Sequence, residues 1–452
     1  MTKHKVLFSP VTRLSGLLSV ELTVEDKNIS EAEVCCTMFR GYEYIMQNRH
    51  ITDAVYLTQR ICGICSTAHG AIASYLLDKV YDNDIEENAQ YIRNIMLAAD
   101  FLQNHIRHFY FFELPDYVIM PKQPPFLNQN CLDCRLNPQE NQRLISNYIK
   151  GIQAAKESHQ ILALFGGKAP HQHSFVHGGV AVDPTPDKIT QALMLLDNIH
   201  NFVKSEMMPD TEILAKRYND YFNIGNTIGR FLSFGLFYFG EKNDQPLFKS
   251  GILENNKLGK PNIDLIQEDI SHAWFHRAKW EKEIKPAPDK LGAYTWTKAV
   301  LYKNKHFEGG PLARMLINGY YRGGTSTMDR IVARSIETLL LTELIKKWLK
   351  KIKPGKAPIK QKKEIVLNQA IAVVDAMRGP LLHSALIENE QISKYDIITP
   401  TGWNFSPKDS VGNRGPIETA LVGTTLPSSK YQYIIPGRII RSFDPCISCA
   451  TH

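Results

Sequence analysis

The sequence lacks a hydrophobic run long enough to cross a membrane. Its longest apolar stretch, residues 231–240, falls short of the ~18 apolar residues that span a bilayer, so we interpret it as buried core. The first residues, Met1–Lys5, lead directly into a strand-like pattern, without the charged and apolar regions of a secretory signal. We therefore expect neither a membrane span nor an export signal in this sequence.

The sequence also lacks a strong charge imbalance. A formal charge of +7 over 452 residues is modest, and 43% hydrophobic with 22% charged residues is typical of a folded protein. Much of the positive charge lies in residues 346–363, which we interpret as a solvated helix end followed by a loop. An anionic partner is the alternative interpretation of that run. We expect no nucleic-acid partner.

No linker divides the chain, and no repeat is present beyond a doubled Cys/His motif. Sequence periodicity and turn residues predict strands within 5–35, short strands with turns over 240–310, and turns with short strands over 395–440. They predict helices over 50–80, 88–112, 138–164, 185–220, 311–320, 327–352 and 364–378. We therefore predict an α+β fold, predominantly helical, with small peripheral β elements. One large domain would span 1–452, with a β-rich segment at about 1–45, a helical core at about 50–230 and 311–390, and a metal-binding tail at 395–452.

The eight cysteines occur in four close pairs, at 35/36, 62/65, 131/134 and 446/449. Close pairs in a large chain indicate metal or redox chemistry rather than a disulfide framework. The pairs 62/65 and 446/449 share the spacing Cys-x-x-Cys and are each followed by a histidine, His69 and His452. We interpret 131/134 as a loop dithiol, with an extra or lost metal site as the alternative, and 35/36 as packing.

Two Cys-x-x-Cys pairs can supply four thiolates to one site. Such soft ligands select Zn²⁺, iron–sulfur clusters, Cu(I) or a redox-active ion such as nickel. Structural zinc is the common outcome of this pattern, but its ligand pairs usually lie close together in sequence. Here 380 residues lie between Cys65 and Cys446. The spacing alone leaves zinc and a redox metal open.

The sequence resembles the large, catalytic subunit of [NiFe] hydrogenases along nearly its whole length. The matching stretches are Pro10–Arg13 with Gly16, Phe39–Glu43, Cys62–His69, His105 with His108–Tyr110, Pro170-His171 with Gly178-Gly179, Gly310–Arg314, Arg378-Gly379, Pro400–Asn404, Arg414–Glu418 and Asp444–His452. So many matches in order make the resemblance specific. It implies reversible cleavage of H₂ to protons and electrons. The alternatives are an H₂-sensing regulatory protein built on the same site and a zinc-binding structural subunit.

The resemblance also implies the metal ligands. Cys62, Cys65, Cys446 and Cys449 would bind nickel, and Cys65 and Cys449 would also bridge to an iron that carries CO and two cyanides. Cys446, as a terminal ligand, would be the catalytic base. Glu43 and the terminal His452 resemble ligands of a Mg²⁺ ion, whose remaining positions waters would fill.

Residues around the metals are implied in the same way. His69 resembles a histidine that hydrogen-bonds a bridging cysteine, and Arg378, paired with Asp444, resembles the arginine above the metals. Thr401, after Pro400, matches the hydroxyl donor to a cyanide.

The sequence departs from the family's pattern at several of these positions. Ser15 stands where most members have a glutamate that carries the proton, Asn104 where many have aspartate, and Met377 where they have proline. Since a hydroxyl relays a proton but cannot hold a charge, we expect slower proton transfer or a water chain through Ser15.

The resemblance implies protein partners as well. The sequence has no further four-cysteine cluster motif, so electrons would leave through an iron–sulfur small subunit in a heterodimer or higher oligomer. Nickel-insertion proteins and a maturation protease that clips an extension after His452 would act earlier, and a sequence that stops at this histidine resembles the processed form. The chain would be cytoplasmic, or exported with a small subunit that has a twin-arginine leader.

Overall fold

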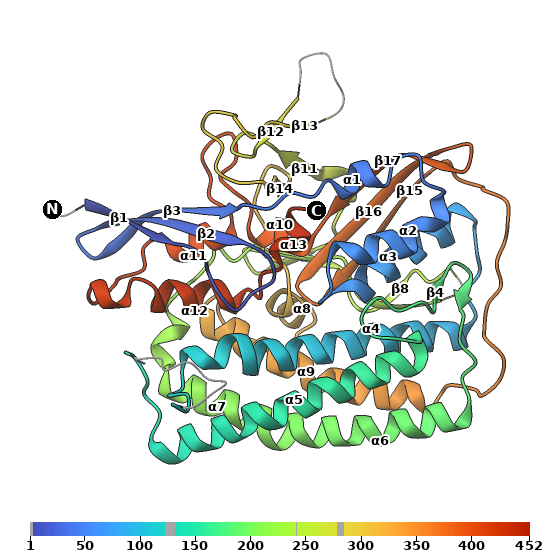
Figure 1. The fold of residues 1–452 in the computed structure, drawn as a ribbon, viewed down its shortest axis with the longest axis horizontal. Coiled ribbons are helices and arrows are strands. Elements are labelled where there is room, and N and C mark those ends of the chain that lie inside the picture. Colours follow the sequence, from blue (N-terminus) through green and yellow to red (C-terminus); the bar gives the residue numbers. More distant parts are fainter. Residues whose placement is uncertain (1–2, 123–131, 241, 278–283) are drawn as a thin grey trace.

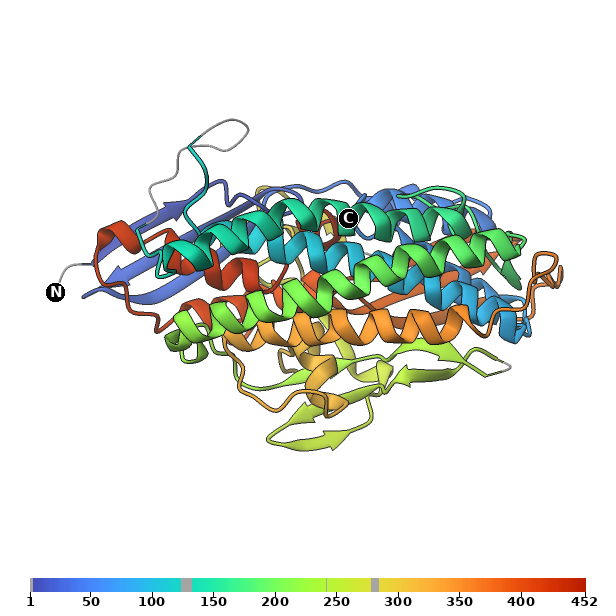
Figure 2. The ribbon, with the colours of Figure 1, turned by 90° about the horizontal axis from the view of Figure 1, so that it is seen from below.

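A computed structural model describes residues 3–122, 132–240, 242–277 and 284–452 (Figure 1). Long helices form one layer, shown side by side in Figure 2, and smaller sheets and short helices lie against it. The predicted fold class, a predominantly helical α+β domain, is confirmed. No helix in the described ranges is both long and apolar enough to cross a membrane.

The helical layer contains most of the predicted helices. Its members are α4 (Glu87–Arg107), α5 (Pro138–Gly166), α6 (Pro186–Phe202), α7 (Met208–Arg217) and α9 (Thr327–Leu349). Helix α3 (Ser66–Val80) packs on both α4 and the sheet of β15 and β16, and the short α8 (Pro311–Ile317) packs on α9. Helix α4 packs against both α5 and α9, and its residues from Ala89 to Ile106 are all buried. It continues into a π-helical turn, His108–Glu113. Two short helices, α1 (Tyr42–Ile45) and α2 (Ala54–Leu57), precede α3.

Local sequence explains where the long helices begin. The side chain of Asn137 accepts a hydrogen bond from the amide of Glu140, whose own side chain accepts from the Asn137 amide, so α5 starts with a capping box. Ser326 and Asp329 form the same arrangement at α9. These bonds satisfy amides that lack partners within the helix.

The predicted N-terminal strands form an antiparallel sheet. It consists of β1 (Lys3–Phe8), β2 (Leu18–Glu25) and β3 (Asn28–Cys36). Alternate residues of β2, such as Leu18, Val20 and Leu22, are buried in a second core together with the short helices near the C-terminus. Both ends of the chain therefore contribute to one core.

The prediction of a helix over 364–378 is wrong. This region belongs to an antiparallel sheet of β15 (Gln369–Ala376), β16 (Gly379–Glu388) and β17 (Gln391–Ile398), so the helical core ends earlier than 390. In β15, the buried Ala370, Ala372 and Val374 alternate with partly exposed Ile371 and Val373. That period of two belongs to a strand, although the alanines have high helix propensity.

The prediction of turns and short strands over 395–440 is wrong where short helices form, and holds for most of the range between them. The structure has α10 (Pro400–Asn404), α11 (Pro416–Leu421) and α12 (Ile434–Ser442), followed by α13 (Ile447–Ala450). All are short, so burial against the N-terminal sheet and the metal-site region holds them rather than intrinsic propensity. Proline at the first position of α10 and α11 was the available signal.

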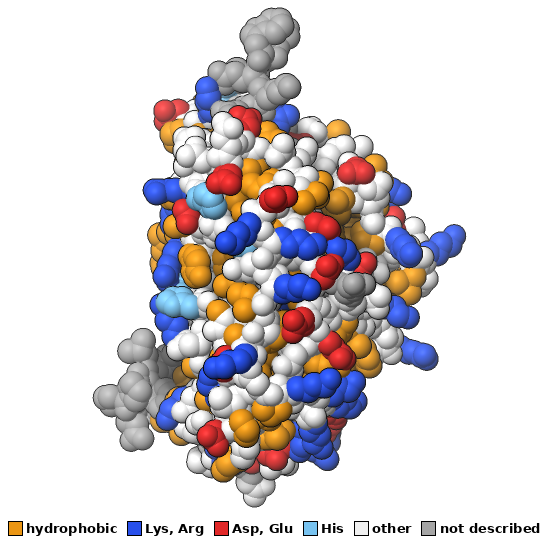
Figure 3. All heavy atoms as spheres, turned by 90° about the vertical axis from the view of Figure 1, so that its right-hand side faces the viewer, with side chains coloured by type: hydrophobic (Ala, Val, Ile, Leu, Met, Phe, Trp, Pro, Cys, Tyr) orange, Lys and Arg blue, Asp and Glu red, His pale blue; other side chains and the backbone are white. Residues whose placement is uncertain are grey.

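The mixed region before residue 310 agrees with its prediction. The small hairpin of β4 (Phe175–Val176) and β5 (Gly179–Val180) and the strands β6 (Phe231–Ser233) and β7 (Leu236–Phe239) come before the predicted range 240–310. The strands within that range are β8 (Gln245–Phe248), β9 (Gly251–Glu254), β10 (Lys257–Gly259), β11 (Ile266–Asp269), β12 (Phe275–His276), β13 (Lys285–Pro286) and β14 (Ala299–Tyr302). Residues 231–240 lie mostly inside the protein, as predicted. Figure 3 shows charges of both signs interspersed on one face, in line with the modest net charge.

A buried arginine, Arg314, hydrogen bonds the turn between β15 and β16. Arg314 donates to the carbonyl oxygens of Ala376 and Met377 at 2.9 Å each and forms ion pairs with Glu337 and Asp375. Burial opposes ionisation of Glu337, but Arg314 outweighs it and lowers the pKa of this carboxyl to about 2. The stabilisation is thus complete above the ordinary pKa of glutamate and is lost only as the pH falls toward 2.

Replacing Arg314 tests this support. Arg314→Met would leave Glu337 and Asp375 buried without a counter-ion, so we expect a loss of about 3–5 kcal/mol in the free energy of unfolding. Lys394→Met breaks the exposed Lys394–Asp396 pair and is the control, with an expected loss of at most ~1 kcal/mol. Urea unfolding measures both; equal losses would contradict the role of Arg314.

Candidate metal centre

Two segments from opposite ends of the chain bring the two Cys-x-x-Cys pairs together. Cys62 and Cys65 lie between a 3₁₀ turn, Thr58–Ile61, and α3, with Cys65 at the N-cap of α3. Cys446 is the N-cap of α13, and Cys449 lies within it. In Figure 1 the C-terminus lies near the middle of the molecule, beside α10 and α13.

The side chain of Arg40 links the two segments, because it donates to the carbonyl oxygens of both Ile61 and Ser448. The tail is also bonded to the N-terminal segment, where the backbone carbonyl of Ser15 accepts a hydrogen bond from the amide of Ile447 at 2.7 Å. Gly16, with φ of +93°, sits so close that a Cβ would lie 2.7 Å from the Ser448 nitrogen. A glycine is therefore required where the N-terminal segment meets the tail.

The four sulfurs form one compact group. They lie within 4.8 Å of one another, with 3.2 Å between Cys62 and Cys446 and 3.0 Å between Cys65 and Cys449. All four are buried and none is in a disulfide. Four thiolates around one ion at about 2.3 Å would have nearly this spread, so the group fits a metal.

The thiols influence one another's protonation. Hydrogen bonds from the neighbouring thiols lower the pKa of Cys62. The same bonds raise the pKa of Cys65, and burial raises that of Cys449. A metal cation would lower the pKa of all four thiols, because it binds the deprotonated sulfurs and releases their protons.

Arg378 lies at the two-residue turn between β15 and β16 and points at the tail. Its Nε donates to the carbonyl oxygen of Asp444 at 2.6 Å, and its Nη2 donates to Oδ1 of Asp444 at 2.9 Å and to Asn104 at 2.7 Å. Asn104 donates in turn to Oδ2 of Asp444 at 2.7 Å. Nη1 of Arg378 is buried and has no hydrogen-bond partner among the described residues. The two N–H donors of this Nη1 atom thus remain for a ligand beside the cysteines.

The other predicted site residues take varied places. Thr401, in α10 after Pro400, accepts a hydrogen bond from the amide of Cys446 at 3.0 Å. The hydroxyl of Ser15 faces that of Ser448 at 3.3 Å. Nδ1 of His69 lies 3.1 Å from His383 rather than bonding a cysteine, and its bond to a bridging cysteine stays a prediction.

The predicted magnesium ligands also come together. Nε2 of His452 lies 3.5 Å from Glu43, and Nδ1 of His452 bonds the carbonyl of Cys449 at 2.7 Å. Lys298 lies 3.5 Å from the second oxygen of Glu43, so a cation already accompanies this carboxylate. The assignment of Mg²⁺ stays a prediction.

Several residues of this region escaped the sequence analysis. Arg40, His383 and Tyr395 line the metal-site region, and Thr67 and Asp100 place unpartnered buried oxygens on α3 and α4. Burial raises the pKa of Asp100 to about 6. A polar residue inside an otherwise buried helix or strand was the available signal. Of the pair 131/134, Cys131 lies outside the described residues, and Cys134 is disulfide-bonded.

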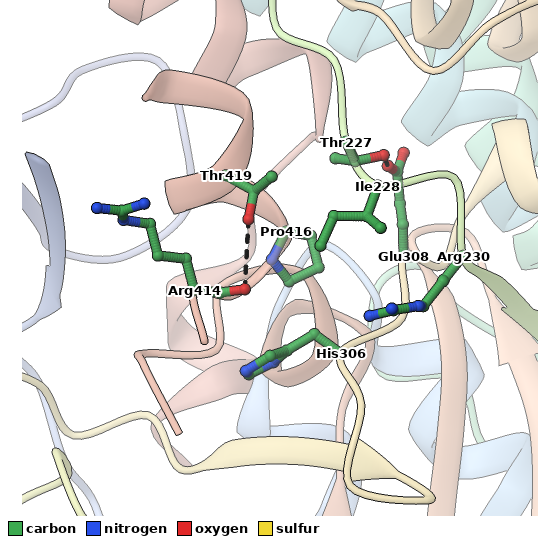
Figure 4. Close-up of a pocket in the computed structure, with 8 residues that line it drawn as sticks. All are labelled: Thr227, Ile228, Arg230, His306, Glu308, Arg414, Pro416 and Thr419. Carbon is green, nitrogen blue, oxygen red and sulfur yellow. Dashed lines mark hydrogen bonds between the residues drawn. The ribbon is translucent and has the colours of Figure 1, made fainter. Parts of the chain in front are cut away.

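A separate pocket lies away from the cysteines (Figure 4). Its lining includes Arg230, His306, Glu308 and Arg414, and its volume of about 10 Å³ holds roughly one water. Arg230 is paired with Glu254, and Glu308 with Arg330. The pocket is too small for a metal with its ligands and is lined by no cysteine, so it is not the candidate centre.

Comparison with known proteins agrees with the geometry of the cysteine group. Residues 40–123, 120–325 and 321–452 match the family described as nickel-dependent hydrogenase. The periplasmic [NiFeSe] hydrogenase large subunit of Desulfomicrobium baculatum is 33% identical, over 100% of this chain and 95% of the relative. The hydrogenase-2 large chain of Escherichia coli K12 is 28% identical, over 99% and 97%.

Solved structures give the same result at the level of the fold. A [NiFeSe] hydrogenase structure from D. baculatum superposes with a TM-score of 0.95 at 32% identity and 100% coverage of both chains. The Ni-Fe-Se hydrogenase of D. vulgaris Hildenborough gives 0.95 at 31%, again with 100% coverage of both chains.

The fold and the four-cysteine site define a metal-dependent oxidoreductase acting on H₂. The chain belongs to the nickel-dependent hydrogenase family, as a large, catalytic subunit. The comparisons favour neither the zinc-stabilised structural subunit nor the sensor. Although several relatives carry selenium in their names, the candidate site in this chain consists of four cysteines.

Removing one thiolate tests the cysteine group. Cys62→Ser and Cys446→Ser should each lower nickel affinity by more than the about 10–100-fold typical of losing an outer hydrogen-bond partner. Elemental analysis of the purified protein measures this as a loss of bound nickel. Cys35→Ser, on β3, is the control and should keep its nickel; retention in Cys62→Ser would contradict the assignment.

Proposed function

We propose that Cys62, Cys65, Cys446 and Cys449 hold a nickel–iron centre at which this subunit cleaves H₂ reversibly. The observation that carries the proposal is the buried group of four free cysteines beside an arginine with an unpartnered N–H. All four would bind nickel, and Cys65 and Cys449 would also bridge to iron. When bound, the centre supplies the heterolytic cleavage of H₂.

Two polar groups would orient the small ligands of the iron. Nη1 of Arg378 has a free N–H, and the hydroxyl of Thr401 accepts from the Cys446 amide and so keeps its own proton for donation. Both are suited to cyanide, which accepts hydrogen bonds. Pro400, at the first turn of α10, fixes the backbone that presents Thr401. The family resemblance implies CO and two cyanides on the iron, and Arg378 and Thr401 would donate to the cyanides.

Cys446 would take the proton from H₂ at its Sγ atom. Ser15 lies beside Cys446 through a β-bridge, and its hydroxyl and that of Ser448 form the adjoining polar surface. Neither hydroxyl holds a charge at neutral pH, so the proton would pass between them or through water to a more distant acceptor. Asp444 would keep Arg378 in place rather than carry the proton, since the arginine counteracts burial and the pKa of Asp444 is lowered to about 2.

Electrons would leave through an iron–sulfur small subunit. Within the described ranges, the four cysteines are the only group of three or more Cys, His, Asp or Glu ligands placed to hold a metal. A second redox cluster is therefore expected in a partner, in a heterodimer or higher oligomer. Glu43 and His452 would bind Mg²⁺ through a carboxylate oxygen and an imidazole nitrogen, with waters completing the shell. Nickel-insertion proteins and a maturation protease would act before the tail closes.

Metal analysis and infrared spectroscopy test the proposed centre. We expect nickel and iron in equal amounts, together with infrared bands from one CO and two cyanides. Zinc without these bands would overturn the proposal. H₂ oxidation with an artificial acceptor then separates an enzyme from a sensor, since only the enzyme turns over rapidly.

Ser15→Glu tests the proton path. A carboxylate beside Cys446 can hold the proton as well as relay it, so we expect H₂/D₂ exchange at least as fast as in the natural chain. Ser9→Glu, exposed in the same N-terminal segment, adds the same charge away from Cys446 and should change nothing. Slower exchange in Ser15→Glu would show that Ser15 is not a weak point in the path.

A further inference from the structure

Three buried polar side chains form a hydrogen-bonded chain that leads from the sheet to the metal-site region. Nδ1 of His69 lies 3.1 Å from Nε2 of His383, and Nδ1 of His383 lies 2.9 Å from the hydroxyl of Tyr395. The exposed fractions are 2%, 0% and 1%. Buried polar groups of this kind are held in place by the bonds they make.

The fold brings the three together from three elements. His69 lies on α3, one turn after Cys65, and its amide hydrogen bonds the carbonyl of Cys65. His383 and Tyr395 lie on β16 and β17, where Ala385 is opposite Tyr395, so the histidine and the tyrosine are diagonal neighbours across the strands. Because α3 packs on β15 and β16, His383 on β16 contacts the ring of His69 on α3.

The partners of these atoms decide where the protons lie. Burial lowers the pKa of His69 to about 4 and that of His383 well below its usual range, so each ring is neutral and carries one N–H. Burial raises the pKa of Tyr395, which keeps its O–H. The hydroxyl of Tyr395 has one hydrogen-bond partner among the described residues, Nδ1 of His383, and therefore donates to it.

The rest of the chain follows from that donation. Nδ1 of His383 accepts, so His383 carries its hydrogen on Nε2 and donates to Nδ1 of His69. The hydrogen of His69 is then on Nε2, the ring nitrogen that does not contact His383. Because His69 lies one helical turn after Cys65, a hydrogen on Nε2 would be available to the four-cysteine group.

We propose that Tyr395 and His383 are positioning residues that hold His69 with its hydrogen on Nε2, so that this imidazole donates a hydrogen bond to a thiolate of the four-cysteine group. The inference deepens the proposed function and rests on it. A hydrogen bond to a thiolate draws electron density from the sulfur, which makes it a weaker base and a weaker donor to its metal. The residues of the sheet would thereby lower the basicity of a metal-binding thiolate without contacting the metals.

Nitrogen NMR of the full, metal-free chain with ¹⁵N-labelled histidine tests the direction of the bonds. Protonated and unprotonated ring nitrogens have well-separated shifts, and His69→Gln and His383→Gln assign the signals by their disappearance. We expect both histidines to carry hydrogen on Nε2. If both carry it on Nδ1, the proposal is overturned, whatever metal the site binds.

Tyr395→Phe tests the start of the chain. Nδ1 of His383 would lose its only donor, so its resonance should move toward that of an unbonded ring nitrogen. Tyr320→Phe, at an exposed tyrosine, is the matched control and should leave the spectrum unchanged. An unmoved His383 resonance in Tyr395→Phe would show that the tyrosine does not donate.

The metal-loaded enzyme tests the consequence. In His383→Leu the Nδ1 atom of His69 has no donor, so the bond to the thiolate should weaken and the CO band should shift to lower frequency. His383→Gln keeps an N–H that reaches His69 and should restore the band. An unchanged CO band in His383→Leu, with nickel and iron still bound, would overturn the role of His383. Absence of both metals from the purified natural chain would instead contradict the proposed function.

Discussion

The ion pair between Arg378 and Asp444 is the constraint on which the metal-site region depends. Both side chains are almost fully buried, where an unpaired charge would be very costly, so each requires the other. Arg378 belongs to the hairpin of β15 and β16, Asp444 to the tail, and Asn104 on α4 bonds both. A single polar contact thereby joins the sheet, the helical layer and the C-terminal segment, and the second cysteine pair follows directly after Asp444.

The sequence predicted the chemistry of the site better than the structure around it. Cysteine spacing indicated a four-thiolate metal site, and the ordered motifs indicated the family. Both signals consist of short stretches of sequence, which can be recognised without knowing the fold. The helices α4, α5 and α9 were also predictable, since their long apolar periodicity is local, as are the capping boxes of α5 and α9. These features depend on neighbouring residues only.

What could not be predicted depends on contacts between distant segments. Strand β15 contains alanines that favour a helix, but its pairing with β16 and its position behind α3 decide its structure. The partners of His69, the support of the hairpin by Arg314 and the contact of Arg40 with both cysteine segments come from the same cause. The sheet that was predicted in part as a helix also contains two unpredicted neighbours of the site, His383 and Tyr395.

The division of the ligands between the two ends of the chain has a consequence for biosynthesis. Each cross-segment pair of sulfurs is separated by 384 residues, and the tail must fold between the N-terminal sheet and α10 to complete the group. A ribosome exposes the first two thiols long before it makes the last two. Nickel therefore cannot find its full ligand set on a nascent chain, and in that interval Cys62 and Cys65 need protection from oxidation and from competing metals.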